Sequence, residues 1–222
     1  ARVPDESTVR KLTRRLGPEL TDALIRRIIA LAARERRFRS RALRVDSTVV
    51  EADIRYPTDA ELCAQAVRTL ARAGRRVCAA VPATTRRVRD RGRAVGRRLR
   101  ALGRTLRRRT EEAKAEVQRL TEEAATCVRA SAREARRLVS QARRSRSRAK
   151  GVSPRARARV IAGLERVAAL AERITEQVRQ RFAGEKISDR LVSLFDVDAR
   201  PIRKGKLAKP TQFGYVVQLA EV

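Results

Sequence analysis

One aspartate in this sequence occupies a position that suits a metal ligand. The segment 42–54 reads ALRVDSTVVEADI, and its β-branched residues predict a strand with Asp46 in the middle. Aspartate is a poor strand former, so Asp46 is either an exposed residue of an edge strand or a metal ligand held on a rigid element. Its carboxylate has the oxygen chemistry that Mg²⁺ prefers.

Four other acidic residues compete for the same interpretation. Asp53 and Asp59 lie on either side of a Tyr-Pro pair, and the commoner role for Asp59, or for Thr58, is to cap the helix that follows. Asp196 and Asp198 have the spacing of a ligand pair, but a turn is the commoner structure for such a segment.

A basic loop is the second candidate site. It contains Arg203, Lys204, Lys206 and Lys209. Such a loop either is a solvated surface segment or holds phosphates next to an active site, and the residues favour neither interpretation.

The charge of the whole chain favours a polyanionic partner. Lys and Arg total 55 against 25 Asp and Glu, a formal charge of +30, and only seven of these cations are Lys. Arginine-rich codon usage contributes to this excess but does not explain the scarcity of acids. Phe and Tyr total six and Trp is absent, so a grip on duplex phosphates fits better than base stacking on aromatic side chains.

Cysteine and histidine content argues against a structural zinc site. Cys63, Cys78 and Cys127 are far apart and histidine is absent, so buried or half-buried reduced thiols are expected. No apolar run reaches the roughly 18 residues of a membrane span, and no membrane partner is expected.

Residues 1–40 are predicted to form an N-terminal helical region. Gly17-Pro18 separates two helices, and the second carries an apolar stripe of Leu20, Leu24, Ile28 and Leu31. The pair is either a helix-turn-helix that binds DNA or, more commonly, a plain helical hairpin.

Residues 57–185 are predicted to form a long helical insertion. Three apolar stripes at spacings of three and four start near Leu62, Val88 and Val160. They predict an antiparallel, coiled-coil-like arm, with the first and third helices lying end to end along a middle helix of about 65 residues, or roughly 97 Å. Such an arm brings the chain back near the strand of residues 42–54.

Residues 186–222 differ in character from the arm. Residues 191–195 predict a short apolar strand, residues 196–201 a turn, and residues 213–222 a clear strand. Because the sequence stops on that strand without a polar tail, we expect a fragment of a larger protein.

Two stretches together resemble a known family. LRVDSTVVEADIRYPTDAELC, and later ISDRLVSLFDVDARPIRKGKLAKPTQFGYVVQLAEV, resemble insertion-sequence transposases of the DDE type with a ribonuclease-H-like catalytic fold. The upstream DESTVRKLTRRLG is similar to their N-terminal helical region. The resemblance implies that Asp46 is the first of three acidic ligands, with the second aspartate and the glutamate expected downstream of Val222.

The resemblance also implies a fold, a chemistry and a setting. The fold would be α+β and mostly α: helices in 1–40, the first core strand in 41–56, the insertion in 57–185 and a return to a truncated ribonuclease-H-like sheet in 186–222. Two Mg²⁺ or Mn²⁺ ions about 3.5–4 Å apart would act on double-stranded DNA at the prokaryotic nucleoid. With a single catalytic carboxylate, Asp46, this chain would be inactive by itself.

A different class of protein remains an alternative. The helical segment alone would suit a non-enzymatic, basic coiled-coil protein that binds nucleic acid. The two strand segments outside the arm favour the transposase, because an architectural helical protein has no use for an aspartate within a strand. Assembly into a homo-oligomer on DNA is left open.

Overall fold

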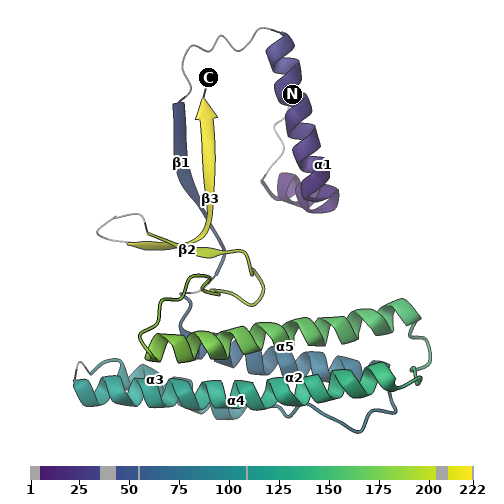
Figure 1. The fold of residues 1–222 in the computed structure, drawn as a ribbon, viewed down its shortest axis with the longest axis vertical. Helices are drawn as coiled ribbons and strands as arrows, with labels where there is room; N and C mark the ends of the chain where they lie inside the picture. The colour runs from purple at the N-terminus through teal and green to yellow at the C-terminus, as the bar shows by residue number, and fades with distance from the viewer. Residues whose placement is uncertain (1–5, 36–43, 55, 109, 204–209, 222) are drawn as a thin grey trace. The chain divides into compact units, whose positions relative to one another are not determined.

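The computed structural model describes residues 6–35, 44–54, 56–108, 110–203 and 210–221. It divides into two compact units, residues 1–48 with 217–222 and residues 49–216, which are described separately. The described residues are mostly helical with one small sheet, which confirms the predicted α+β, mostly α class (Figure 1). No helix in these ranges has the length and apolar character needed to cross a bilayer.

Helix α1 (Glu6–Arg34) has a break where the sequence predicts one. Gly17 has φ 77°, a left-handed conformation that glycine adopts without steric cost, and Pro18 follows it. The Thr21 hydroxyl donates to the Gly17 carbonyl over 2.7 Å and closes the first turn of the second helical piece. The apolar stripe of this piece is exposed, with Leu20, Leu24 and Ile28 each more than half accessible.

The sheet contains β1 (Arg44–Glu51), β2 (Arg200–Arg203) and β3 (Thr211–Glu221) in the order β1-β3-β2. Strand β2 runs antiparallel to β3, with Arg200 opposite Gly214. Just beyond β1, the Ala52 N–H donates to the Phe213 carbonyl over 2.8 Å. The expectation that the chain returns near the strand of residues 42–54 is therefore confirmed for the described residues.

Gly214 shows how closely β1 and β3 approach. A Cβ added at this position would overlap the Val50 carbonyl oxygen and lie 3.0 Å from the Glu51 Cα. A side chain cannot be accommodated there, so the glycine of the FGY motif is required by backbone packing.

The predicted strand at 191–195 is wrong. These residues form irregular backbone, and the short strand is instead β2, in a segment predicted as turn and loop. Leu191 and Leu194 are buried in the core of the helices. Their apolar character therefore reflects packing against helices rather than pairing in a sheet.

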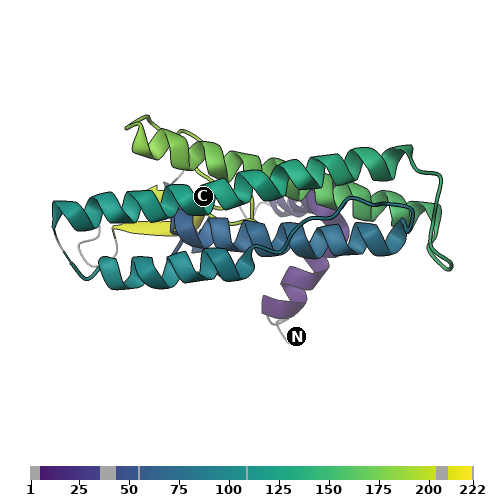
Figure 2. The ribbon, with the colours of Figure 1, turned by 90° about the horizontal axis from the view of Figure 1, so that it is seen from below.

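Four helices form the bundle of the second unit: α2 (Asp59–Ala80), α3 (Gly92–Thr105), α4 (Glu111–Arg144) and α5 (Pro154–Phe182). Helices α2, α4 and α5 pack on one another, and α3 packs on α2 and α4 (Figure 2). Alanines occupy many interface positions, including Ala66, Ala124 and Ala171, each fully buried. Such small side chains let the helix axes approach closely.

Side-chain caps fix where three of these helices begin. The hydroxyls of Thr58, Thr110 and Ser153 accept hydrogen bonds from the backbone N–H groups three residues ahead, over 3.1–3.2 Å. Each cap satisfies one of the amide groups that have no partner within the helix. In α3 the N-cap residue, Arg91, makes no such hydrogen bond.

The predicted single middle helix is wrong, because the chain turns back between α3 and α4. Arg98 of α3 contacts Glu123 of α4, and Arg91 before α3 contacts Glu134, so the two helices are antiparallel. Leu106, placed by the sequence in a continuous apolar stripe, is 63% exposed. The Thr110 cap then starts a new helix, and α2 and α5 pack side by side rather than end to end.

Candidate functional site

Asp46 is an exposed residue of β1, in the unit formed by residues 1–48 and 217–222. Its Oδ1 accepts the backbone N–H of Ser47 over 2.8 Å. In the ranges that the structure describes, no three acidic, cysteine or histidine side chains gather as a metal site. Asp46 therefore stands in this structure as a single accessible carboxylate on a strand.

The basic loop is only partly described. Arg203 ends β2 and is exposed, whereas Lys204, Lys206 and Lys209 lie outside the described residues. Arg203 belongs to the unit of residues 49–216, whereas Asp46 belongs to the other unit.

Arg203 lines a cleft whose other residues come from the beginning and the end of the second unit in sequence. Its volume is about 510 Å³, and its walls include Tyr56, Arg181, Arg190 and Phe213. These residues come from the end of the segment after β1, from α5, from the irregular segment before β2, and from β3. The rings of Tyr56 and Phe213 meet edge to face with centroids 5.4 Å apart, and Tyr56 is 73% exposed.

Asp59 is a buried carboxylate behind this cleft. Its side chain is 1% exposed and accepts hydrogen bonds from Gln177 over 2.9 Å, Arg181 over 2.7 Å and Arg190 over 3.3 Å. Thr58, the other candidate for the helix cap, is the N-cap residue of α2. Asp59 instead holds two of the guanidinium groups that line the cleft.

Gln177 extends this network to the backbone. Its amide nitrogen also donates to the Leu191 carbonyl over 3.3 Å, and its amide oxygen accepts the Leu191 N–H over 2.9 Å. Two helices and the segment that carries Arg190 are thereby fastened at one point. Because the donors are held before a ligand arrives, binding an anion here requires little ordering of these arginines.

The remaining acidic candidates are Asp53, Asp196 and Asp198. Tyr215 donates its hydroxyl to Asp196, and this hydrogen bond is the main cause that raises the pKa of Tyr215 to about 12. Asp198 lies in a turn, as the sequence predicts, and Asp53 is exposed. Neither pair gathers into a metal site within the described residues.

The cleft has the chemistry of an anion site with an aromatic edge. Arg181 and Arg190 are 52% and 32% exposed, and a guanidinium carries five N–H donors, so donors remain for a ligand after Asp59 is bound. Arginine forks match the geometry of phosphate oxygens. Sequence analysis singled out Arg203 but missed Arg181 and Arg190, although Arg190 lies within the ISDR motif and Asp59 within YPTD.

Comparisons of this chain with protein-family models, with curated proteins and with solved structures found no match. The functional interpretation therefore rests on the residues and on the geometry above.

Proposed function

We propose that this chain is part of a DDE-type DNA transposase, which binds duplex DNA and contributes the first acidic ligand of a metal-dependent phosphoryl-transfer site. One observation supports this most: the segments that carry the resemblance, separated by more than a hundred residues of sequence, adjoin in one sheet and line one cleft. A helical insertion that leaves and returns at the same place would preserve such a core.

In this proposal Asp46 is the catalytic and metal-binding residue. An accessible carboxylate on a strand fits one ligand of a Mg²⁺ or Mn²⁺ pair, which would activate the attacking oxygen and stabilise the leaving oxygen. A lone carboxylate binds Mg²⁺ weakly and cannot position two ions. The chain by itself is therefore expected neither to cut nor to join DNA.

The test of the catalytic assignment uses the complete reading frame that contains this sequence. It is supplied in trans to a marker flanked by the terminal repeats of its element, and excision and joining are scored. Asp46→Asn should abolish transposition and leave DNA affinity unchanged or slightly raised, because a negative charge near the phosphates is removed. Asp53→Asn, an equal charge change at an exposed residue, is the matched control. Transposition that survives Asp46→Asn would refute the assignment.

In the same proposal Arg203, Lys204, Lys206 and Lys209 contact DNA phosphates. Each phosphate contact contributes about −0.9 to the slope of log K against log salt, so duplex binding should be steeply salt-dependent and show little sequence preference. Reversing the charges of Lys204 and Lys206 should weaken binding to all sequences alike. Fluorescence anisotropy with unrelated duplexes measures both effects, and a flat salt dependence would reject DNA as the partner.

A non-enzymatic nucleic-acid-binding role is the second candidate. It is favoured by the helical bundle, where many exposed arginines, among them Arg72, Arg97 and Arg133, have no carboxylate within 4 Å in the described part of the chain. Transposition that depends on Asp46 separates the two candidates, since a purely architectural protein has no reaction to lose.

A further inference from the structure

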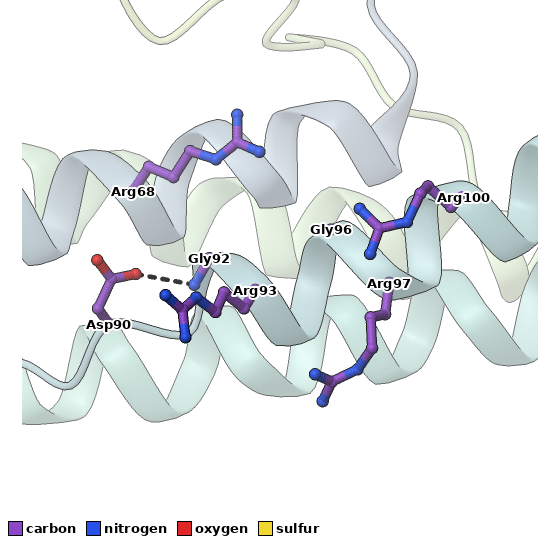
Figure 3. A pocket seen from close by; sticks show the side chains of 7 residues that line it. All are labelled: Arg68, Asp90, Gly92, Arg93, Gly96, Arg97 and Arg100. Carbon is purple, nitrogen blue, oxygen red and sulfur yellow. Dashed lines mark hydrogen bonds between the residues drawn. The ribbon is translucent and has the colours of Figure 1, made fainter.

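The outer face of α3 carries a row of arginines. Arg93, Arg97, Arg100 and Arg104 follow one another at spacings of four, three and four residues, and all four are exposed. The first three line a cleft of about 800 Å³ together with Arg68 of α2, and their side chains extend from neighbouring turns of α3 (Figure 3). We call Arg68, Arg93, Arg97, Arg100 and Arg104 the α3 arginine face.

In the described part of the chain, the arginines on the inner side of α3 are paired with carboxylates, and those on the outer side are not. On the inner side, Arg98 contacts Glu123 of α4 over 2.8 Å, and Arg91, just before the helix, contacts Glu134 over 2.6 Å. On the α3 arginine face, no carboxylate of the described residues lies within 4 Å of these guanidiniums. Asp90 is the one acid among the residues lining the cleft, and its oxygens accept from the Gly92 N–H and from Arg75.

This face destabilises the helix that carries it. Like charges three and four residues apart repel one another, and Arg93 lies in the first turn, where the helix dipole disfavours cations. The N-cap residue of α3, Arg91, makes no side-chain cap hydrogen bond, and the helix contains Gly92, Gly96 and Gly103. Since folding gains nothing from four unpaired arginines here, a polyanionic partner is the simplest source of compensation.

The dimensions and chemistry of the face fit a DNA backbone. Arg93 and Arg104 are eleven residues apart, about 16 Å along the helix, which compares with a major groove about 12 Å wide between its phosphate walls. The lining residues of the cleft include no aromatic side chain on which a base could stack. A guanidinium group often donates two parallel hydrogen bonds to one phosphate, and such contacts do not depend on the base sequence.

We propose that the α3 arginine face is a DNA-binding surface that grips the phosphate backbone of duplex DNA, separate from the cleft at Arg203. The proposal rests on the proposed function for the identity of the polyanion. It gives the helical insertion a role of its own, which is to hold DNA without contributing to the choice of sequence.

The test compares two triple variants of the whole chain by anisotropy with a labelled duplex over a range of salt concentrations. The first is Arg93→Gln with Arg97→Gln and Arg100→Gln. The control on α5 combines Arg155→Gln, Arg159→Gln and Arg166→Gln, which removes the same charge from exposed arginines that also have no carboxylate within 4 Å in the described part of the chain. Glutamine keeps the helix propensity close to that of arginine, so both variants should fold.

The α3 variant should lose three phosphate contacts, so the salt slope should become shallower by about 2.7 and affinity at 0.1 M salt should fall by between about tenfold and 500-fold. Its thermal stability should be unchanged or higher, because repulsion within α3 is relieved. The α5 variant should retain most of the wild-type slope.

Three results would overturn the proposal in different ways. If the α3 variant binds like the wild type, this surface is not used, and the proposed function is unaffected. If the α3 and α5 variants lose affinity equally, only total charge matters. If the wild-type chain does not bind duplex DNA at all, the proposed function fails as well.

Discussion

Replacing Asp59 by asparagine should destabilise the protein strongly, although Asp59 has no part in the metal chemistry proposed for Asp46. The carboxylate is 1% exposed and accepts hydrogen bonds from Gln177, Arg181 and Arg190. Asparagine has nearly the same shape but no charge, and its amide nitrogen would face groups that can only donate. The change therefore removes the compensation for two arginines while leaving the packing intact.

The size of the effect follows from the burial of each partner. Breaking a buried ion pair by removing one partner costs about 3–5 kcal/mol. Here Arg181 and Arg190 are 52% and 32% exposed, so water replaces part of the lost interaction. The asparagine oxygen can still accept from Gln177. We therefore expect a loss of roughly 2–3 kcal/mol, in line with one or two hydrogen bonds to a charged group.

Urea unfolding followed by far-ultraviolet circular dichroism measures this loss. With a slope of about 2 kcal/mol per molar urea, the midpoint should fall by roughly 1–1.5 M. Asp53→Asn, at an exposed position, is the control and should change stability by less than about 0.5 kcal/mol. A double-mutant cycle with Arg181→Gln should show less than additive losses. An Asp59→Asn loss no larger than that of the control would refute this account of the cleft.

Three further predictions concern other parts of the structure. A hydrogen bond from the Arg91 guanidinium lowers the pKa of Glu134. The stability that this pair contributes is therefore present above the unfolded-state pKa of about 4.3, and it is lost as the pH falls through the lower folded-state pKa. Melting curves between pH 3 and 6 should show a weaker acid dependence for Glu134→Gln than for the wild type, and an unchanged dependence would contradict this. Gly214→Ala should force β1 and β3 apart and lower the free energy of unfolding by about 1–3 kcal/mol. Hydrogen exchange at the Ala52 amide should become faster, whereas an unchanged rate would mean that the strands accommodate a methyl group. Burial, followed by the charge of Asp59, raises the pKa of the Cys63 thiol to about 12. A thiol reagent at pH 8 should therefore modify Cys78 and Cys127 in the native protein, but Cys63 only after unfolding. Equal modification rates at all three cysteines would refute the burial of Cys63.

Local sequence patterns determined most of the secondary structure. The apolar stripe of α5 is buried as predicted, with Leu164, Ala171 and Ile174 at zero exposure, because a repeat of three and four residues can hide its apolar side chains only on one helical face. The break at Gly17 was predicted because glycine is favoured just past the end of one helix and proline at the first position of the next. The strand at Asp46 followed from its β-branched neighbours.

Tertiary structure decided where the predicted middle helix folds back and which residues form the cleft. A stripe of period three to four is the same in one long helix as in two packed antiparallel helices, so the reversal between α3 and α4 became visible only from the pairing of Arg98 with Glu123. In the same way, a helix-starting motif looks alike whether its aspartate faces water or is buried. Asp59 is buried because α5 and the segment at Arg190 close over it, more than a hundred residues away in sequence. Such contacts depend on how whole helices pack, and no local pattern of residue types encodes them.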